Sequence, residues 1–297
     1  MQSIVRWAVV VGVLVVALGI GGLVPQAQVA TYIVCSDIAW PPFEWVDKNG
    51  EFVGFDLDVM RIIAILKGYK VDIRNLAFDS IIPAVQAGRC DIGASGFTIT
   101  EERAKIVDFS DPYWESNQAV LVHKEMGLNI ITAFTAGNII GAQRGTTGAD
   151  WVQTNVIDKG IKVELRLYDT YPLAELDLIA KRIQAVVEDE PAAKVAVKTS
   201  KGALKIAGII MTEEQFGFLV QKGDPKKILP RINDGMKEMK KKGIWSNLVE
   251  AYFGVDVDLE RITKCWADLR GWLERGKPAE YAENLAACMA GQEYNKP

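Results

Sequence analysis

Residues 93–103, with the sequence GASGFTITEER, combine the groups that bind a small carboxylate. They offer glycine backbone at Gly93 and Gly96, hydroxyl groups at Ser95, Thr98 and Thr100, and a guanidinium at Arg103. A guanidinium is a planar fork that donates two parallel hydrogen bonds to a carboxylate. The stretch follows an apolar strand and leads into a helix expected to begin near Thr100, whose first amide groups add partial positive charge. The alternative is an ordinary helix cap with a solvated Arg103, and the rest of the chain decides between them.

Strands and helices alternate along the chain in two cycles. The first cycle contains a strand at residues 32–35 and a helix with apolar periodicity over residues 56–66. Asp79 is expected to cap a further helix over residues 80–87. The second cycle begins after His123, and its first strand runs into a loop rich in glycine and threonine. This alternation predicts parallel sheets with ligand-binding loops at the carboxyl ends of the strands.

The two cycles predict two α/β lobes. The chain is expected to cross from one lobe to the other near residues 118–123 and to return near residues 214–222. The predicted domains are lobe 1 (31–120 and 216–256), lobe 2 (121–215) and a C-terminal helical extension (257–297). The extension is amphipathic, and it either packs on the body as a cap or offers a docking face to a membrane partner.

The first 30 residues have the pattern of an export signal. Arg6 precedes an unbroken apolar and glycine segment over residues 7–24, and small residues at Ala27 and Ala30 resemble a cleavage zone. The apolar segment is also just long enough to span a bilayer, so a retained anchor is the alternative. Either outcome predicts a periplasmic or other extracytoplasmic location.

Charge and residue usage exclude several classes of protein. The net charge is −4 and the pI is about 5.3, which disfavours nucleic acid as a partner. His123 is the only histidine and the chain has no CxxC motif, so no metal site and no cofactor are expected. We expect a monomer.

The four cysteines of an exported chain predict disulfides. Cys265 and Cys288 lie at similar distances on either side of the helix break at residues 276–278, so two antiparallel helices would bring them to the same level. Cys35 and Cys90, each in or beside an early strand, remain as a possible second pair.

The order of several short motifs resembles the family 3 extracellular solute-binding proteins, the polar amino-acid receptors of bacterial ABC importers. The resemblance covers roughly residues 31–255, and no single motif is specific without the others. The matching stretches are WPPFE (40–44), VGFDLD (53–58), FDSIIP (78–83), GFTITEER (96–103), VDFSDPY (107–113), GTT (145–147) and residues 245–254.

The resemblance implies a type II periplasmic-binding-protein fold, in which two α/β lobes are joined by two hinge strands and close on a ligand. It implies that Arg103 binds the α-carboxylate of an amino acid, with help from Thr98 and the amides around Thr146 and Thr147. Asp189 would bind the α-ammonium group together with the carbonyl of Gly96.

The remaining implied ligand contacts involve the amino-acid side chain. Trp40 and Phe78 would enclose it, Asp37 would contact its far end, and Gln143, with Glu188, would approach from lobe 2. Asp37 favours glutamine, arginine or lysine as the ligand. Arg144 would reverse that preference toward acidic amino acids if it pointed inward.

Three functions follow from these patterns. The leading one is a receptor that captures a polar L-amino acid and delivers it to the membrane permease subunits of an ABC transporter, without catalysis. The second is an exported cyclohexadienyl or arogenate dehydratase of the same fold. The third is an amino-acid sensor tethered to the membrane through residues 7–24.

Overall fold

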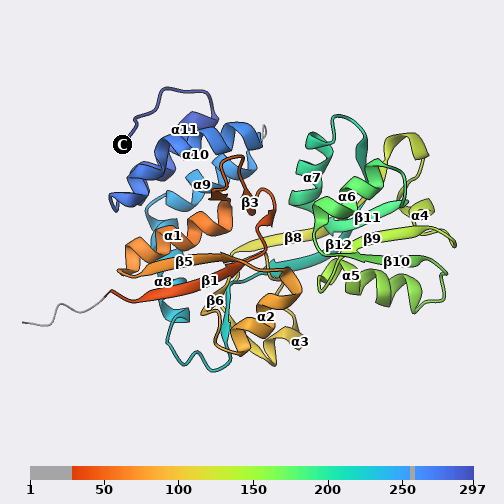
Figure 1. The fold of residues 1–297 in the computed structure, drawn as a ribbon, viewed down its shortest axis with the longest axis horizontal. Coiled ribbons are helices and arrows are strands. Elements are labelled where there is room, and N and C mark those ends of the chain that lie inside the picture. The colour runs from red at the N-terminus through yellow and green to blue at the C-terminus, as the bar shows by residue number, and fades with distance from the viewer. Residues whose placement is uncertain (1–28, 255–257) are drawn as a thin grey trace, which may run out of the picture.

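Two five-stranded sheets organise the chain, and two long strands connect the halves of the molecule (Figure 1). The computed structural model describes residues 29–254 and 258–297. The predicted export signal therefore lies, apart from its last residues, outside the described part. No helix in that part is both long enough and apolar enough to cross a bilayer.

The first sheet has the strand order β5-β1-β6-β13-β7. β1 pairs in parallel with β5 and β6, whereas β13 runs antiparallel to β6 and β7. The strands are β1 (Thr31–Ser36), β5 (Lys70–Asn75), β6 (Ile92–Gly93), β7 (Val107–Phe109) and β13 (Leu219–Gln221). Beside it lies a small antiparallel sheet of β2 (Ala39–Trp40), β3 (Glu44–Val46) and β4 (Phe52–Val53).

The second sheet has the strand order β10-β9-β11-β8-β12. β9 pairs in parallel with β10 and β11, and β8 runs antiparallel to β11 and β12. The strands are β8 (Trp114–His123), β9 (Ile139–Gln143), β10 (Glu164–Tyr168), β11 (Ala185–Asp189) and β12 (Leu204–Phe216). β8 and β12 pair from His123 to Trp114, so together they form the connection toward the first sheet.

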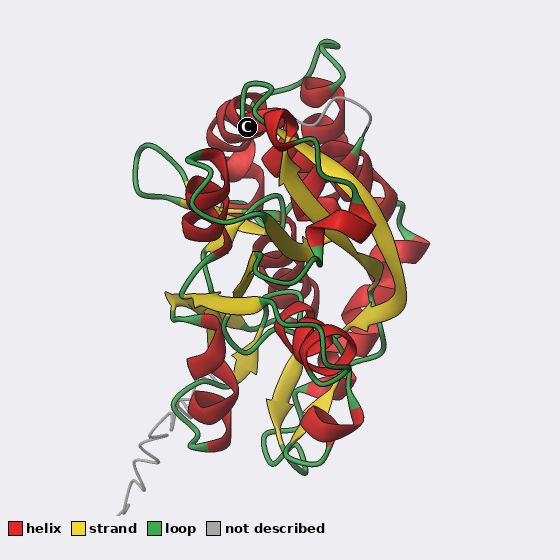
Figure 2. Ribbon diagram, turned by 90° about the vertical axis from the view of Figure 1, so that its right-hand side faces the viewer, coloured by secondary structure: helices red, strands yellow, loops and turns green. Residues whose placement is uncertain are grey.

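Helices surround the strands (Figure 2), and they pack on both faces of each five-stranded sheet. In the first half they are α1 (Phe55–Lys67), α2 (Phe78–Gln86), α3 (Glu101–Ala104), α8 (Leu229–Lys241) and α9 (Ile244–Phe253). In the second half they are α4 (Ile130–Ala133), α5 (Thr147–Val152), α6 (Tyr171–Ile179) and α7 (Glu190–Thr199), with a short 3₁₀ helix η1 (Lys124–Met126) and a π-helical segment η2 (Gln153–Ile157). The hairpin α10 (Leu259–Glu274) and α11 (Pro278–Met289) follows.

The predicted start of α2 was wrong. The helix begins at Phe78, its N-cap is Ala77, and no side chain caps it. Asp79 lies inside the first turn, where a carboxylate interacts favourably with the helix dipole without being the cap. This shift matters because it places Phe78 and Asp79 at the end of the helix that faces the second half of the molecule, where Asp79 pairs with Arg144.

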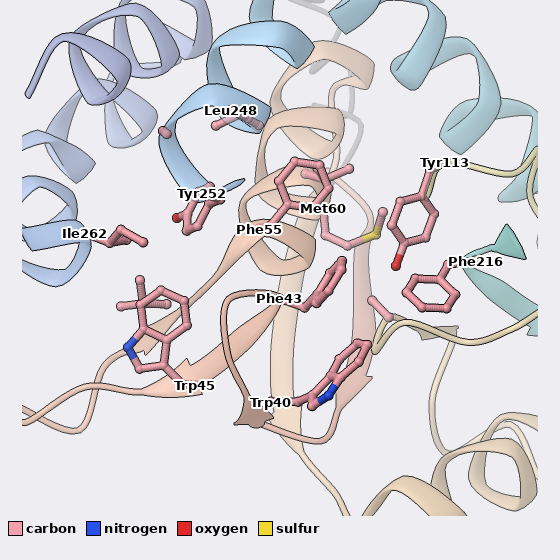
Figure 3. Close-up of a cluster of buried hydrophobic side chains, with 14 of the residues drawn as sticks. Trp40, Phe43, Trp45, Phe55, Met60, Tyr113, Phe216, Leu248, Tyr252 and Ile262 are labelled. Carbon is pink, nitrogen blue, oxygen red and sulfur yellow. The ribbon is translucent and has the colours of Figure 1, made fainter. Parts of the chain in front are cut away.

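An aromatic core joins the small sheet to the hinge strands (Figure 3). Phe43, which is fully buried, stacks on Trp40 with 4.5 Å between ring centroids. It also meets Phe216 of β12 and Trp114 of β8 edge-on, at 5.8 Å and 5.7 Å. Aromatic pairs at these distances contribute about 0.5–1.5 kcal/mol each beyond area burial. The ends of both hinge strands are therefore fixed to the first half.

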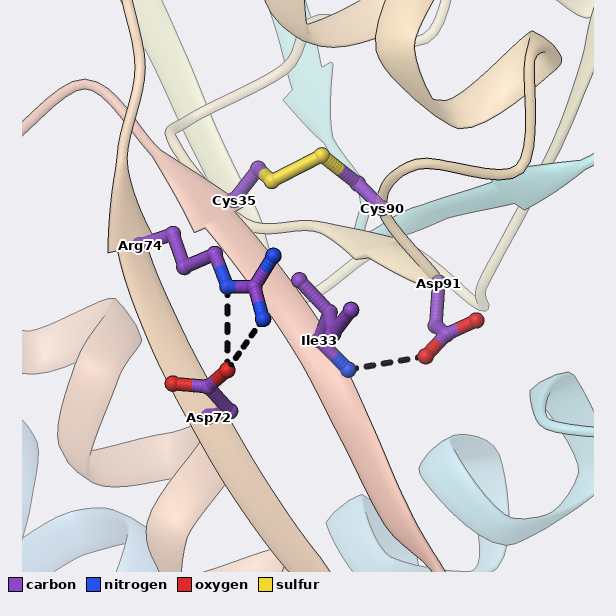
Figure 4. Close-up of a disulfide and its surroundings, with 6 residues drawn as sticks. All are labelled: Ile33, Cys35, Asp72, Arg74, Cys90 and Asp91. Carbon is purple, nitrogen blue, oxygen red and sulfur yellow. Dashed lines mark hydrogen bonds and ion pairs between the residues drawn. A yellow bond between two sulfur atoms is a disulfide. The ribbon is translucent and has the colours of Figure 1, made fainter.

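Both cysteine pairs form disulfides. Cys35 at the end of β1 bonds to Cys90, and this bond joins β1 to the turn before β6 (Figure 4). Asp91 beside it accepts a hydrogen bond from the Ile33 amide at 2.8 Å. Cys265 bonds to Cys288 between α10 and α11.

The C-terminal hairpin packs on the first half of the molecule through a buried carboxylate. Asp58 of α1 is fully buried and accepts hydrogen bonds from Trp266 of α10 (3.2 Å), Tyr252 of α9 (2.6 Å) and Tyr281 of α11. Arg61 adds an ion pair at 2.9 Å. These contacts make the hairpin a part of this half, which supports the cap interpretation of the extension.

Candidate functional site

One cavity is lined by side chains from both halves of the molecule. It measures about 20 Å³ in this closed arrangement, room for about one water molecule, so an amino acid enters only if the halves separate. Ten of the predicted ligand-binding residues line it, Glu188 does not, and Ser95 and Tyr171 complete the wall. The lining residues are Asp37, Trp40, Phe78, Ser95, Gly96, Thr98, Arg103, Gln143, Thr146, Thr147, Tyr171 and Asp189.

Arg103 is held by backbone and aromatic rings. It lies in α3, and its amide donates to the Thr100 hydroxyl, which caps the helix. Its Nη1 donates to the Thr98 carbonyl at 2.8 Å, and its Nη2 donates across the cleft to the Gly145 carbonyl at 2.9 Å. Phe78 stands 5.7 Å from the guanidinium carbon. Burial lowers the pKa of Arg103, so the guanidinium gains from an anion placed beside it.

The aromatic wall depends on a glycine. Trp40, backed by Phe43, packs directly on Gly96, which has φ 55°. A Cβ added to Gly96 would lie 2.2 Å from the Trp40 ring, so no other residue fits there without moving the indole. Phe78 is likewise backed by Phe97, with 4.6 Å between centroids. The two rings lining the cavity are thus held rigidly.

A carboxylate and an amide meet at another part of the wall. Gln143 is the last residue of β9. Its Nε2 donates hydrogen bonds to the Asp37 carboxylate at 2.5 Å and to the Asp169 carbonyl at 2.8 Å. Burial raises the pKa of Asp37 to about 6, and the hydrogen bond from Gln143 offsets part of that rise. A buried carboxylate with a raised pKa gains from a neighbouring positive charge.

Asp189 supplies a second carboxylate, from the end of β11. Its Oδ1 accepts a hydrogen bond from Gln118 Nε2 of β8 at 3.1 Å. Burial raises the pKa of Asp189 well above its ordinary value, and the nearby charge of Glu214 raises it further. The cavity wall therefore carries two carboxylates and one guanidinium, an arrangement that favours a ligand with net positive charge.

A third carboxylate lies behind the wall and was missed by the sequence analysis. Glu214 of β12 accepts hydrogen bonds from the hydroxyls of Thr98 (2.6 Å) and Thr147 (2.7 Å). Its other oxygen accepts from Gln118 Nε2 at 3.0 Å. Tyr171 was also missed; its hydroxyl lies 3.3 Å from that of Thr146. Neither position belongs to a motif that the sequence analysis used.

Two residues considered as ligand contacts lie outside the cavity. Glu188 precedes Asp189 in β11, and consecutive side chains of a strand point to opposite faces. It is fully buried, and burial raises its pKa well above the ordinary value, with the charge of Glu175 adding to the rise. Arg144 lies at the rim, within 3.8 Å of Asp79 and 3.9 Å of Asp169, and is half exposed. It therefore gives no support to an acidic ligand.

Two α/β lobes, two connecting strands and a cavity lined from both lobes define a type II periplasmic-binding-protein fold. Comparison with known proteins agrees with this class. The model of the bacterial extracellular solute-binding proteins, family 3, matches residues 32–255. The chain belongs to that family.

Similar proteins are amino-acid-binding proteins. The L-cystine-binding protein TcyJ of Escherichia coli (strain K12) is 30% identical over 86% of this chain and 96% of its own. ABC transporter arginine-binding protein 1 of the same organism is 31% identical over 72% of this chain and 87% of its own. A solved structure of an ancestral arginine-binding protein bound to arginine is 39% identical, with a TM-score of 0.70, over 76% of this chain and 99% of its own.

Proposed function

We propose that this protein is an extracytoplasmic receptor that closes on a polar L-amino acid, preferably a cationic one, and delivers it to an ABC transporter. The observation that carries the proposal is the joint lining of one interlobe cavity by Arg103, Asp189 and Asp37. The first two groups complement the two ends of a zwitterion. The third complements a positive side chain.

The backbone around Thr98 suits the α-carboxylate. In the bridge between Thr98 and Phe216, Ile99 donates to Gln215 and Gly217 donates to Phe97. In such an antiparallel pair the N–H and C=O of Thr98 both point away from β12. Its C=O accepts from Arg103, so its N–H lies on the same side as the guanidinium. These donors, with the amides around Thr146 and Thr147, would bind the carboxylate.

The remaining groups suit the rest of an amino acid. Asp189 would accept from the α-ammonium group, assisted by the carbonyl of Gly96. The ligand side chain would lie against Trp40 and Phe78, whose ring faces also attract a cation. Each charge-assisted hydrogen bond contributes roughly 1.5–3 kcal/mol net. Several of them together reach the ~8 kcal/mol that corresponds to a micromolar dissociation constant.

Charge favours arginine or lysine over glutamine. Once a zwitterion has neutralised Arg103 and Asp189, the carboxylate of Asp37 still lacks a cation. A guanidinium can take two hydrogen bonds to a carboxylate, which a neutral amide cannot match in strength. The similarity to arginine-binding proteins supports the same choice. Glutamine remains an outcome of the test.

A calorimetric titration with the twenty L-amino acids and D-arginine tests the assignment. We expect L-arginine to bind most tightly, lysine and glutamine more weakly, and glutamate and D-arginine not at all. Asp37→Asn should weaken arginine binding about tenfold or more and glutamine binding far less. If no polar amino acid binds, the receptor proposal is wrong, and if glutamate binds best, the role given to Asp37 is wrong.

Arginine binding should also depend on pH below neutrality. The pKa of Asp37 is about 6, so at pH 7.5 the carboxylate is ionised and at pH 5 it is mostly protonated. Arginine affinity should therefore fall about tenfold between pH 7.5 and pH 5, because the ligand must displace a proton. Glutamine affinity should change much less. Equal slopes for both ligands in the calorimeter would contradict this role.

The stability of the protein without added amino acid gives an independent check on Asp37. Its pKa is raised from 3.8 to about 6 in the folded state. The folded state therefore holds the proton more tightly, and stability is lost as pH rises from about 4 to 6. Asp37→Asn should raise the melting temperature at pH 7.5 and leave it nearly unchanged below pH 4.

Delivery to a transporter requires export, which we propose occurs through residues 1–30. If the segment is cleaved, the protein is a free receptor. If it is retained as an anchor, the protein is tethered to the membrane, as the sensor hypothesis requires. The mass of the mature protein recovered from its native cell envelope decides between them.

A further inference from the structure

Glu214 lies where both lobes and both hinge strands, β8 and β12, meet. Its Oε2 accepts from Thr98 of lobe 1 at 2.6 Å and from Thr147 of lobe 2 at 2.7 Å. The two hydroxyl oxygens are themselves 3.3 Å apart. Its Oε1 accepts from Gln118 on the other hinge strand at 3.0 Å. A single acceptor atom can bond to hydroxyls of both lobes only while the lobes are closed.

The backbone of β12 has a bulge immediately before Glu214. Ile210 pairs with Gln118 and Glu214 pairs with Ser116, so residues 211–213 face Asn117 alone. The side chain of Asn117 accepts hydrogen bonds from the amides of Thr212 and Glu213, both at 3.1 Å. Glu213 has φ 51°, which is unfavourable for a residue other than glycine. Bulges of this kind re-aim side chains next to functional sites.

Because of the bulge, the neighbouring side chains of Glu213 and Glu214 lie in different environments. Glu213 is exposed, whereas Glu214 is 9% exposed and directed toward the cleft. The hydroxyl protons of Thr98 and Thr147 are both donated to Glu214, so these two hydroxyls offer only lone pairs to other groups. The ligand carboxylate is then left to Arg103 and to backbone amides, and it does not compete with Glu214.

We propose that Glu214 is an interlobe latch. Its carboxylate holds Thr98 and Thr147 together in the closed protein, so part of the drive for closure comes from the protein itself and the rest from the amino acid. The amino acid enters when the lobes separate, and the side chains lining the cavity shift to hold it when the lobes close again. Where the Glu214 contacts re-form around the bound amino acid, a larger closed population before binding lowers the apparent dissociation constant in proportion. This inference rests on the proposed function in one respect, that the two lobes open and close. Its first test requires no amino acid, so it can fail or succeed independently of ligand binding.

The test measures the distance between the lobes by double electron–electron resonance. Spin labels are attached to Gln86→Cys in lobe 1 and Asn155→Cys in lobe 2, both of which are exposed. Without amino acid, we expect a short-distance population in the parent protein that falls about tenfold or more in Glu214→Gln. Glu213→Gln removes the same charge one residue away and should leave the distribution unchanged.

Two further measurements separate a latch from a general effect of charge. Glu214→Asp keeps the charge but is one methylene shorter, and it should open the lobes as Glu214→Gln does. L-Arginine should bind about tenfold more weakly to Glu214→Gln, with folding verified by circular dichroism. Three results would overturn the proposal: no short-distance population in the parent, equal behaviour of Glu214→Gln and Glu213→Gln, or tighter arginine binding to Glu214→Gln, which would make Glu214 a competitor of the ligand.

Discussion

Replacement of Arg103 by alanine should weaken amino-acid binding about 100-fold or more. The guanidinium is the only cation among the residues described as lining the cavity, so its loss leaves the ligand carboxylate desolvated and without a charged partner. Truncating one member of a buried ion pair commonly costs 2–5 kcal/mol, and 1.4 kcal/mol corresponds to a factor of ten. Arg103 also donates to Gly145 of the opposite lobe, so the substitution removes a closure contact as well.

Arg103→Lys distinguishes charge from geometry. A lysine ammonium is a point charge and cannot reach the Thr98 carbonyl, the Gly145 carbonyl and a ligand carboxylate as a planar fork does. We expect an intermediate loss of about tenfold. Arg74→Ala is the matched control, because Arg74 is exposed and pairs with Asp72 on the same strand. The affinities of Arg103→Ala, Arg103→Lys and Arg74→Ala are measured by calorimetric titration with the amino acid that binds best. Unchanged affinity in Arg103→Ala would remove the basis of the receptor assignment.

The sequence was informative where a side chain follows the end of a strand or the start of a helix. Arg103, Gln143 and Asp189 each occupy such positions, and local patterns place those positions at the edges of the sheets. The family motifs then indicated that both lobes face one cleft. Ten of the predicted ligand residues consequently line one cavity, and their contacts with an amino acid are a proposal.

Glu214 illustrates what local patterns could not reveal. Glu213 and Glu214 are chemically identical neighbours, and only the pairing of β12 with β8 decides which one is buried. That register depends on Asn117, almost a hundred residues earlier in the chain, which accepts two amide hydrogen bonds in the bulge. A shift of one residue would turn the other glutamate toward the cleft. Long-range pairing of this kind leaves no periodic signal in the sequence.

The start of α2 was misplaced for a related reason. Asp79 is a favourable N-cap residue, and no neighbouring residue is a stronger candidate for the cap. In the structure Phe78 is already helical, and its ring packs on Phe97 and Arg103. Tertiary packing of the ring therefore outweighs the local preference for a side-chain cap.

Asp58→Asn should lower the free energy of unfolding by about 2–4 kcal/mol without changing amino-acid binding directly. The Asp58 carboxylate accepts from Arg61, Tyr252, Trp266 and Tyr281, with donors at both oxygens. An asparagine side chain has one oxygen and one NH₂ group, so either Arg61 and Trp266 face the NH₂ group or the two tyrosine hydroxyls do. In the first case two donors lose their acceptor, and in the second the hydroxyls must accept and their own protons lose the carboxylate. Buried donors left without an acceptor cost about 1–3 kcal/mol each, and more if charged.

The same substitution determines whether the C-terminal hairpin is part of the stability of lobe 1. Two of the four donors belong to α10 and α11, and the Cys265–Cys288 disulfide holds those helices together. Asp72→Asn, at an exposed position of β5, provides a control with the same loss of charge. Urea unfolding should show the loss for Asp58→Asn alone. An Asp58→Asn protein as stable as the control would mean that the hairpin is not anchored through this carboxylate.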